Sequence, residues 1–348
     1  MEKKLTIIIP VYNTEKYLLR CFNSVDNPFV NVVVVDDGSI DKSPQIIDEF
    51  CANHENFKAI HISNHGPAYA RLVGLKEVKT EYFSFVDSDD VANIDNIIKL
   101  CMDMDKNNIK IGNGRMTVYL PDIDIPFNSR KWNKEQINFD KDKRDFSNIT
   151  CSLLDKVWHI SCLDLFMDKS KQALYEDLEF VYYVLARQGS MLHSNSVVYN
   201  YCMRSSINNS TSLVGLKPAT SNGLKELIGA TTSMKNKFIN YGFYEEFSKE
   251  LDSIIIKHFY QRMRVIMTTK EIENKKEMID LVFGMLESYI PNWRKNKYYL
   301  EGFKGSEYND LISYLMVESY SKLFNITGKC DGSCSELLDE YNKIIRLK

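Results

Sequence analysis

Four short apolar runs alternate with helix-like segments in the first part of the chain. The runs are rich in β-branched and aromatic residues, as buried strands are, and they cover residues 5–9, 32–35, 57–62 and 82–86. Between the first two runs, apolar residues recur at helical spacing, among them Leu18, Phe22 and Val25. The resulting β-α-β-α-β-α-β order predicts an α/β fold with a mostly parallel sheet flanked by helices.

Carboxylates follow two of these predicted strands. Asp36 and Asp37 end the second run, and Asp87, Asp89 and Asp90 follow the fourth. Because the carboxyl ends of parallel strands meet at one edge of a sheet, where ligands bind, we expect a single site there. Crowded carboxylates favour a divalent cation such as Mg²⁺ or Mn²⁺, which usually completes its coordination with substrate phosphates. The alternative is a solvated acidic turn that caps the following helix.

Composition sets further limits. The chain has 348 residues, 44% hydrophobic and 26% charged, which is enough for one large domain or two smaller ones. Its formal net charge of -3 gives no indication of nucleic-acid binding. The N-terminal residues lead into the first strand pattern without a signal peptide, and no apolar run reaches the ~18 residues of a membrane span. Eight scattered cysteines in a chain of this size are typical of reduced thiols. We therefore expect a cytoplasmic protein.

The C-terminal part has a different pattern. Apolar residues recur at helical spacing in successive stretches, so we expect a first domain over 1–216 and a helical accessory region over 217–348, with a last helix at 337–347. Two stretches, 260–264 and 294–299, mix arginine or lysine with tyrosine. They leave two alternatives open, which are peripheral contact with the inner face of the plasma membrane and an ordinary solvated helix face.

Several motifs occur in a fixed order. They are Pro10-Val11-Tyr12-Asn13, Val35-Asp36-Asp37-Gly38-Ser39, Asn64-x-Gly66-x-x-x-Ala70-Arg71, Asp87-Ser88-Asp89-Asp90, Glu176-Asp177-Leu178-Glu179-Phe180 and Tyr199-x-Tyr201-x-x-Arg204. Together they resemble the motifs of the family 2 glycosyltransferases with a GT-A fold, of the bacterial surface-polysaccharide type, up to about residue 212. Departures are Leu72 after Arg71, a short segment after the first helix, and residues 156–162, which differ where relatives often have Trp-Gly-Lys-Leu-Tyr.

The resemblance implies a nucleotide-sugar donor, with a UDP-sugar favoured, and Mn²⁺ or Mg²⁺ as cofactor. It implies that Asp89 binds the metal, that Asp87 binds the metal or the donor ribose, and that Asp90 is a secondary metal ligand. It also implies that Asp37 accepts a hydrogen bond from the base or ribose. It implies that Arg71 contacts the base or pairs with a nearby acid. The other residues implied in nucleotide-sugar binding are Pro10, Val11, Tyr12, Asn64, Ser88, Glu176 and Arg204. The alternatives are a solvated surface cation for Arg71 and core packing for Tyr12.

The resemblance also implies a general base. Asp177 would take the proton from a hydroxyl of a glycan or lipid-linked glycan acceptor, and a single base with direct attack implies inversion at the anomeric carbon. Its alternative role is a carboxylate at a helix N-terminus. Residues 205–212 would form either a lid over the donor phosphates or a plain linker.

Three other functions can be compared with the motifs of this chain. A sugar nucleotidyltransferase would share the acidic site but needs a glycine-rich loop after the first strand, where this chain has Pro10-Val11-Tyr12-Asn13. A dehydrogenase would need a G-x-G-x-x-G motif after a strand, which the sequence lacks. A non-catalytic carbohydrate- or partner-binding protein on the same fold is a further alternative, and turnover of a sugar nucleotide would separate it from an enzyme.

Overall fold

The computed structural model describes residues 3–120, 123–128, 133, 135–141, 143–166, 176–202, 221–269, 272–273, 275–304, 306 and 308–324. The chain divides into two compact units, a sheet unit of residues 1–142 and 151–207, and a helical unit of residues 143–150 and 208–348. The expected boundary between residues 216 and 217 lies outside the described residues. Residues 143–150 belong to the helical unit, although they fall inside the range 1–216 expected for the first domain.

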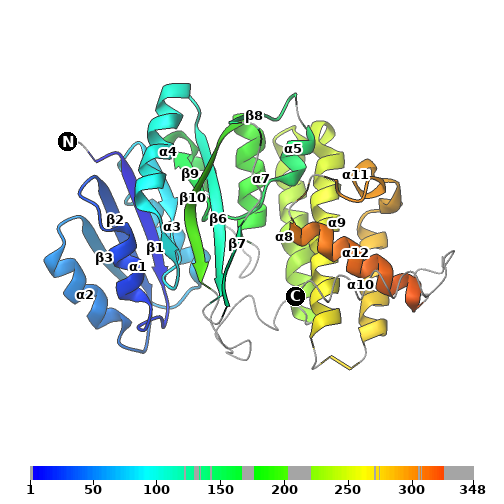
Figure 1. Ribbon diagram of the computed structural model, residues 1–348, viewed down its shortest axis with the longest axis horizontal. Helices are drawn as coiled ribbons and strands as arrows, with labels where there is room; N and C mark the ends of the chain where they lie inside the picture. The colour runs from blue at the N-terminus through cyan, green and yellow to red at the C-terminus, as the bar shows by residue number, and fades with distance from the viewer. Residues whose placement is uncertain are drawn as a thin grey trace. The chain divides into compact units, whose positions relative to one another are not determined.

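A mixed sheet forms the centre of the sheet unit (Figure 1). The strand order is β3 (Phe57–Ile62), β2 (Val30–Asp37), β1 (Leu5–Val11), β4 (Tyr82–Phe85), β9 (Lys156–His159), β6 (Ile111–Leu120), β10 (Ser190–Cys202) and β5 (Val91–Ala92), with β7 (Ile123–Asn128) on β6 and β8 (Gln136–Asn138) on β10. The first four strands in this order are parallel to one another, as predicted, whereas β9 is antiparallel to both β4 and β6. Beyond β9, β6 and β10 are parallel, while β7 pairs antiparallel with β6, and β5 and β8 pair antiparallel with β10.

The register of the parallel strands brings their carboxyl ends to one edge. Val11 of β1 pairs with Asp36 of β2, and Ile8 of β1 pairs with Phe85 of β4. The Val86 N–H then donates to the Ile8 carbonyl at 3.0 Å. The residues that follow β1, β2 and β4 therefore leave the sheet side by side, as the sequence predicts.

Helices cover both faces of the parallel strands. The apolar faces of α1 (Leu18–Val25), α2 (Ser43–Asn53) and α4 (Ile94–Asn107) pack into one large core, and α3 (Pro67–Leu75) packs on the opposite face over Val33 and Val35. Gly74 permits α3 to approach β1 closely, because a Cβ there would lie 2.4 Å from Cγ2 of Ile8. This layered arrangement confirms the predicted α/β fold.

An aromatic contact joins α7 (Glu176–Gln188) to the central strand β4. Phe166 ends the short helix α6 (Leu163–Phe166), which follows the 3-10 helix η1 (Ile160–Cys162). Its ring lies 6.1 Å from Phe180 of α7, 5.6 Å from Phe83 and 6.1 Å from Phe85, measured between ring centroids. The start of α7 is thereby held on the strand that leads into the acidic residues.

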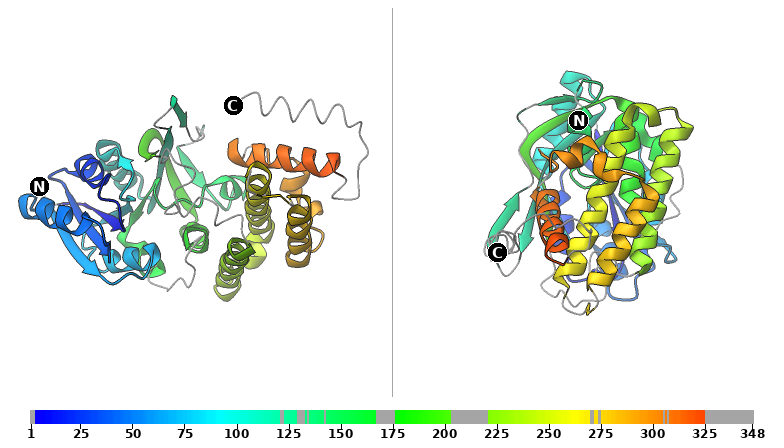
Figure 2. Two further views of the ribbon diagram at one scale, coloured as in Figure 1. Left: turned by 90° about the horizontal axis from the view of Figure 1, so that it is seen from below. Right: turned by 90° about the vertical axis from the view of Figure 1, so that its right-hand side faces the viewer.

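The helical unit is built around α9 (Tyr244–Thr268), which contacts the other helices of the unit (Figures 1 and 2). Its buried apolar side chains recur at helical spacing along the sequence, and they include Phe247, Leu251, Ile254, Ile255, Phe259 and Met263. The other helices are α5 (Lys143–Asn148), α8 (Ser221–Asn240), α10 (Lys275–Tyr289), η3 (Trp293–Lys295), α11 (Lys297–Leu300) and α12 (Tyr308–Leu323). The helix expected at 337–347 lies outside the described residues.

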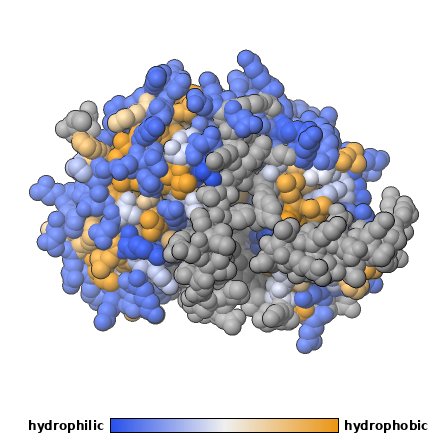
Figure 3. Space-filling model, in the orientation of Figure 1, coloured by the Kyte–Doolittle hydropathy of each residue, from blue (hydrophilic) through white to orange (hydrophobic). Residues whose placement is uncertain are grey.

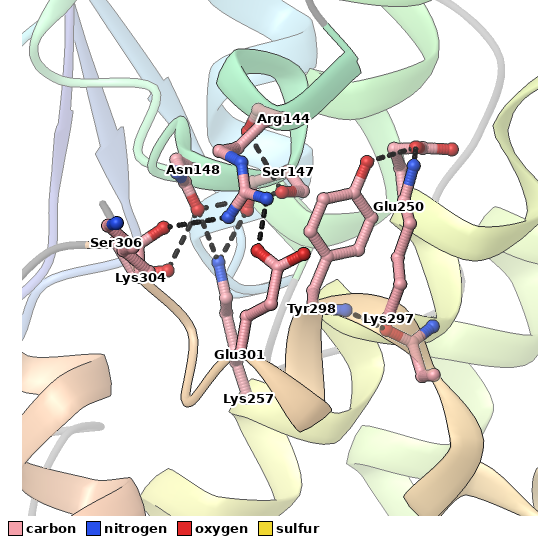
Figure 4. A network of polar contacts seen from close by, with 11 residues as sticks. Arg144, Ser147, Asn148, Glu250, Lys257, Lys297, Tyr298, Glu301, Lys304 and Ser306 are labelled. Atoms are coloured by element: carbon pink, nitrogen blue, oxygen red, sulfur yellow. Dashed lines mark hydrogen bonds and ion pairs between the residues drawn. The ribbon is translucent and has the colours of Figure 1, made fainter.

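A polar network ties α5 to the rest of the helical unit (Figure 4). The ammonium of Lys257, on α9, donates to the Ser147 carbonyl at 2.7 Å and to Oδ1 of Asn148 at 2.9 Å. Ser306 donates to the same Asn148 oxygen at 2.8 Å, and Arg144 pairs with the carboxylate of Glu301. The Lys257 side chain is only 5% exposed, and burying such a charge is costly unless it is hydrogen-bonded. The segment 143–150 is therefore an integral part of the helical unit.

The stretches 260–264 and 294–299, for which membrane contact was one of two alternatives, have buried tyrosines. Tyr260, Tyr298 and Tyr299 are all buried, and Tyr260 and Tyr299 donate to the carboxylate of Glu318. The aromatic side chains of those stretches are therefore not on the surface, where a membrane contact would need them. Among the described residues, no helix combines the length and the apolar character needed to cross a bilayer. The visible surface is mainly hydrophilic, with separate hydrophobic patches (Figure 3).

Candidate functional site at the carboxyl ends of β1, β2 and β4

Residues 87–90 form an acidic turn directly after β4. The Asp90 N–H donates to the Asp87 carbonyl at 3.0 Å and closes the turn. The Ser88 hydroxyl accepts from the Thr14 hydroxyl at 2.9 Å, and Arg20 of α1 donates to the Asp89 carbonyl at 2.7 Å. Contacts from the segment after β1 and from α1 therefore fix the backbone of the acidic turn.

The side chains of the acidic turn differ in exposure. Ser88 and Asp90 are buried, whereas Asp87 and Asp89 are partly exposed. One carboxylate oxygen of Asp90 accepts from the Tyr199 hydroxyl at 2.7 Å, and the other accepts from the Cys202 N–H at 2.7 Å. Asp90 is thus engaged with β10, and its expected role as a secondary metal ligand stays a prediction. Asp87 and Asp89 remain the carboxylates that face solvent in this turn.

The carboxylates of the acidic turn repel one another. Burial raises the pKa of Asp90 to about 8, and the negative charges of Asp89 and then Asp87 act in the same direction. The hydrogen bonds from Tyr199 and Cys202 lower this pKa. A cation beside Asp87 and Asp89 would relieve this repulsion, and oxygen ligands suit Mg²⁺ or Mn²⁺. Within the described part of the chain, no group of at least three His, Cys, Asp or Glu side chains is arranged to hold a metal. A bound ion would therefore need further oxygen ligands, as Mg²⁺ commonly takes from substrate phosphates.

Arg71 reaches the acidic turn from α3. Its Nη2 donates to Oδ1 of Asp87 at 2.7 Å, and its side chain is only 11% exposed. The sequence left open whether Arg71 contacts the base, pairs with an acid or lies on the surface. The structure shows the pairing with an acid. This ion pair connects the helix that covers one face of the sheet to the acidic turn.

Asp37 organises the loop that precedes α3. Its two carboxylate oxygens accept from the backbone N–H groups of His65 and Gly66 at 2.8 and 2.7 Å. Gly66 has φ +90°, a conformation that favours glycine, and it begins α3 as the N-cap residue. Burial raises the pKa of Asp37, while these two bonds lower it. Asp37 thus holds the loop in which Asn64 is exposed, and its expected contact with the donor stays a prediction.

The end of β1 and the residues that follow it lie between the other two strand ends. Pro10 and Val11 are buried, while Tyr12 is 47% exposed, so core packing does not account for its ring. Asn13 adopts a positive φ of 52°, which asparagine tolerates. Its side-chain oxygen accepts from the Ile40 N–H at 2.8 Å beyond the end of β2, and Thr14 binds Ser88 after β4. Hydrogen bonds therefore connect all three strand ends into one edge.

His61 connects the end of β2 to α2. Its Nδ1 lies 3.0 Å from Oδ2 of Asp36, and its Nε2 lies 3.1 Å from Oδ1 of Asp48. The hydrogen bond with Asp36, followed by that with Asp48, raises the pKa of His61 above its ordinary value. Asp36 also accepts from the Ser39 N–H at 3.1 Å, so the same carboxylate supports the turn after β2. Protonated His61 is therefore bonded on both ring nitrogens.

We expect His61→Gln to lower the free energy of unfolding more at about pH 6 than at about pH 9. Because the folded state raises the pKa of His61, the stabilisation is fully present below the unfolded pKa of about 6.5 and is lost as pH rises through the folded pKa. Urea unfolding at both pH values measures the difference. Glu49→Gln, which removes a neighbouring exposed acid on α2, serves as the control. An equal loss at both pH values would contradict a charged His61 bridge.

Asp177 lies at the start of α7. Its Oδ1 accepts from the adjacent Leu178 N–H at 2.8 Å, and its carboxylate also forms a hydrogen bond with the Cys151 thiol. Burial, followed by the charge of Asp177, raises the pKa of Cys151, so a neutral thiol faces this carboxylate. Phe180, one turn along α7, contacts Phe166, which also touches β4. The structure thus links the start of α7 to the strand before the acidic turn.

The part of the chain that carries these strand ends matches a known family. The model of the family described as Glycosyl transferase family 2 matches residues 6–161. The chain contains a family 2 glycosyltransferase domain. That domain begins within β1 and ends just after β9, so it includes the ends of β1, β2 and β4 and the whole acidic turn.

Curated relatives match the chain over short segments. Putative glycosyltransferase EpsH of Bacillus subtilis (strain 168) is 36% identical over 89 residues, which are 25% of this chain and 26% of EpsH. The teichoic acid poly(glycerol phosphate) polymerase of Staphylococcus epidermidis is 40% identical over 92 residues, which are 25% of this chain and 13% of that polymerase. The chain therefore spans about a quarter or less of the length of these two relatives.

A solved structure extends the likeness beyond the glycosyltransferase domain. The crystal structure of S. aureus TarS 1-349 in complex with UDP has a TM-score of 0.60 at 19% identity, and the match covers 92% of this chain and 91% of that chain. At this identity the likeness shows a shared fold, which supports the sheet unit and the helical unit alike.

Three sequence expectations for the glycosyltransferase domain and its surroundings fall outside the description. Arg204 and the segment 205–212 lie outside the described residues, and only the backbone of Glu176 is described, as the first residue of α7. Sequence reasoning missed the role of the Tyr199 hydroxyl, which accepts from the Asp87 N–H at 3.1 Å and donates to Asp90. The Tyr199-x-Tyr201 motif was the available signal, but it gave no indication of a partner in the acidic turn after β4.

Proposed function

We propose that the chain is a nucleotide-sugar-dependent glycosyltransferase that transfers a sugar to a hydroxyl group with inversion at the anomeric carbon. One observation carries the proposal: three strand ends of a family 2 glycosyltransferase domain are hydrogen-bonded into one edge, where Asp87 and Asp89 face solvent. Ligands bind at this edge of open α/β sheets. A nucleotide sugar has a diphosphate that suits the carboxylate-and-cation end and a nucleoside that suits the Tyr12 end.

The residues present fit a divalent cation. Asp89 and Asp87 would hold Mn²⁺ or Mg²⁺ together with the donor diphosphate, because they are partly exposed carboxylates of one turn. The bound ion would supply neutralisation of the negative charge that develops on the leaving diphosphate. Arg71 keeps one oxygen of Asp87 engaged at 2.7 Å, which orients this carboxylate. The Ser88 side chain is bound by Thr14 and holds the turn in shape.

The nucleoside is assigned to the ends of β1 and β2. Tyr12 presents an exposed aromatic ring, and Pro10 and Val11 set the backbone beside it. Asp37 holds the loop that exposes Asn64, so these groups would lie around the base and ribose. Uridine is the base implied by the family resemblance. The TarS structure with UDP has a similar fold, and for this reason UDP is the first nucleotide to test.

Asp177 is assigned the proton-transfer step. The acceptor hydroxyl would give its proton to the Asp177 carboxylate as its oxygen attacks the anomeric carbon, and the bond to the diphosphate oxygen would break on the opposite side. This direct displacement inverts the anomeric configuration. The Leu178 N–H and the Cys151 thiol fix the carboxylate at the start of α7.

The acceptor is assigned by chemical class. We propose a glycan or a lipid-linked glycan of the bacterial surface, because EpsH is named a putative glycosyltransferase and a second relative is named a teichoic acid polymerase. The reaction would take place in the cytoplasm, as the scattered cysteines of the sequence suggest.

UDP with Mn²⁺ is expected to raise the unfolding temperature more than CDP or GDP with Mn²⁺, because a ligand of the native state raises apparent stability. Tyr12→Ala is expected to reduce the UDP effect, since Tyr12 is 47% exposed and contributes little to the core. Met102→Ala, which removes an exposed side chain on α4, is the matched control. Thermal unfolding followed by dye fluorescence measures the unfolding temperature of the wild type and of both variants with each nucleotide. Equal shifts for the three nucleotides would contradict the assignment of uridine.

A further inference from the structure

The hydroxyl of Tyr199 lies between two residues of the acidic turn. Tyr199 is on β10 and is fully buried. Its hydroxyl accepts from the Asp87 N–H at 3.1 Å and donates to Oδ2 of Asp90 at 2.7 Å. One side chain of a distant strand therefore binds both the first and the last residue of the turn.

Other contacts fasten the same region to β10. The Cys202 N–H donates to Oδ1 of Asp90 at 2.7 Å, and β5 pairs antiparallel with β10 directly after the turn, with Ala92 opposite Tyr199. On the opposite side, Thr14 holds Ser88 and Arg20 holds the Asp89 carbonyl. The acidic turn is thus fixed from both sides, and Tyr199 is the side chain of β10 that reaches its backbone at Asp87.

We propose that Tyr199 is a positioning residue for the metal and diphosphate site. It fixes the backbone from which Asp87 and Asp89 project, without contacting the ligand itself. This inference rests on the proposed function, because it assumes that those two carboxylates bind a cation with a nucleotide diphosphate. Residues that orient metal ligands typically change metal affinity about 10–100-fold when they are removed.

The chain offers a matched control at the opposite end of β4. Tyr82 is also buried, and its hydroxyl donates to the carboxylate of Asp105, far from the acidic turn. Tyr82→Phe and Tyr199→Phe each remove one buried hydroxyl that is bonded to a carboxylate. Both variants should lose stability, but only Tyr199→Phe frees the Asp87 N–H.

The test compares the Mn²⁺ dependence of UDP binding in the wild type and the two variants. The apparent Mn²⁺ affinity is obtained by titrating Mn²⁺ at fixed UDP and following UDP binding by calorimetry, at a temperature where circular dichroism shows each protein folded. We expect about a 10–100-fold weaker Mn²⁺ affinity for Tyr199→Phe and no more than about a 2-fold change for Tyr82→Phe. Saturating Mn²⁺ should restore UDP binding to Tyr199→Phe, which a merely destabilised protein would not show.

Equal Mn²⁺ affinities for the two variants, with the wild type binding UDP and Mn²⁺, would overturn the inference and leave the proposed function intact. If the wild type binds neither UDP nor Mn²⁺, the proposed function fails and the inference fails with it. Should Tyr199→Phe not fold, Cys202→Pro removes the other β10 donor to Asp90 and is expected to weaken Mn²⁺ affinity as well. Unchanged Mn²⁺ affinity in a folded Cys202→Pro variant would then contradict the inference that contacts from β10 position the acidic turn for metal binding.

Discussion

Asp177→Asn is expected to lower kcat for sugar transfer by about 10²–10⁴-fold while UDP affinity stays unchanged. Asparagine keeps the size and polarity of the side chain but cannot take a proton from the acceptor hydroxyl. It can still accept from the Leu178 N–H, which Asp177 binds at 2.8 Å, so the start of α7 should be preserved. The measurement is kcat with an identified acceptor, beside UDP affinity for the same variant.

Asp164→Asn is the matched control for this variant, because Asp164 is an exposed acid on α6 of the same unit. Its kcat should equal that of the wild type. Unchanged kcat in Asp177→Asn would mean that the carboxylate only stabilises the N-terminus of α7 and that another residue is the general base. A joint loss of kcat and UDP affinity would mean that Asp177 supports the fold or the donor site instead.

Asp89→Ala is expected to abolish Mn²⁺-dependent UDP binding and turnover together. The substitution removes a partly exposed carboxylate, but it keeps the Asp89 carbonyl that accepts from Arg20 at 2.7 Å, so the acidic turn should keep its shape. A cation that loses one of two protein ligands loses most of its affinity at this site. Calorimetric titration of Mn²⁺ and UDP, and the rate of UDP-sugar consumption, provide the two readouts.

Asp95→Ala removes an exposed acid in the first turn of α4, close in sequence to the acidic turn, and should leave both readouts unchanged. Wild-type turnover in excess EDTA, or turnover by Asp89→Ala at the wild-type rate, would reject the metal assignment. Loss of turnover with normal Mn²⁺ and UDP binding would instead assign Asp89 to a later step of the reaction.

The architecture of the sheet unit was predictable because its signals are local. Buried strands such as Leu5–Val11 consist of consecutive apolar residues, and the carboxylates after β2 and β4 follow them directly in sequence. Parallel pairing then places these strand ends at one edge regardless of loop details. The antiparallel strand β9 was not anticipated, because residues 156–159 are short and carry no alternating pattern that sets their direction.

The different environments of the three carboxylates in the acidic turn were not predictable from the sequence. The sequence does not distinguish the carboxylates of Asp87, Asp89 and Asp90 from one another. In the structure, Asp90 is buried and contacts Tyr199 and Cys202, which are more than a hundred residues away in the chain. The same limit applies to α5, whose place in the helical unit depends on the bonds from Lys257. Contacts between segments that are distant in the sequence determine both the burial of Asp90 and the place of α5, and no local pattern of residues indicates such contacts.

The central claim is that this chain turns over a nucleotide sugar, and release of UDP from UDP-sugars measures it most directly. Purified protein would be incubated with a panel of UDP-sugars and Mn²⁺, without added acceptor, and free UDP would be followed over time. We predict that at least one UDP-sugar is consumed by slow hydrolysis, that EDTA stops the release, and that Asp177→Asn reduces it. If UDP binds but no UDP-sugar is consumed with or without candidate glycan acceptors, the chain is a binding protein on a glycosyltransferase fold, and the claim is contradicted.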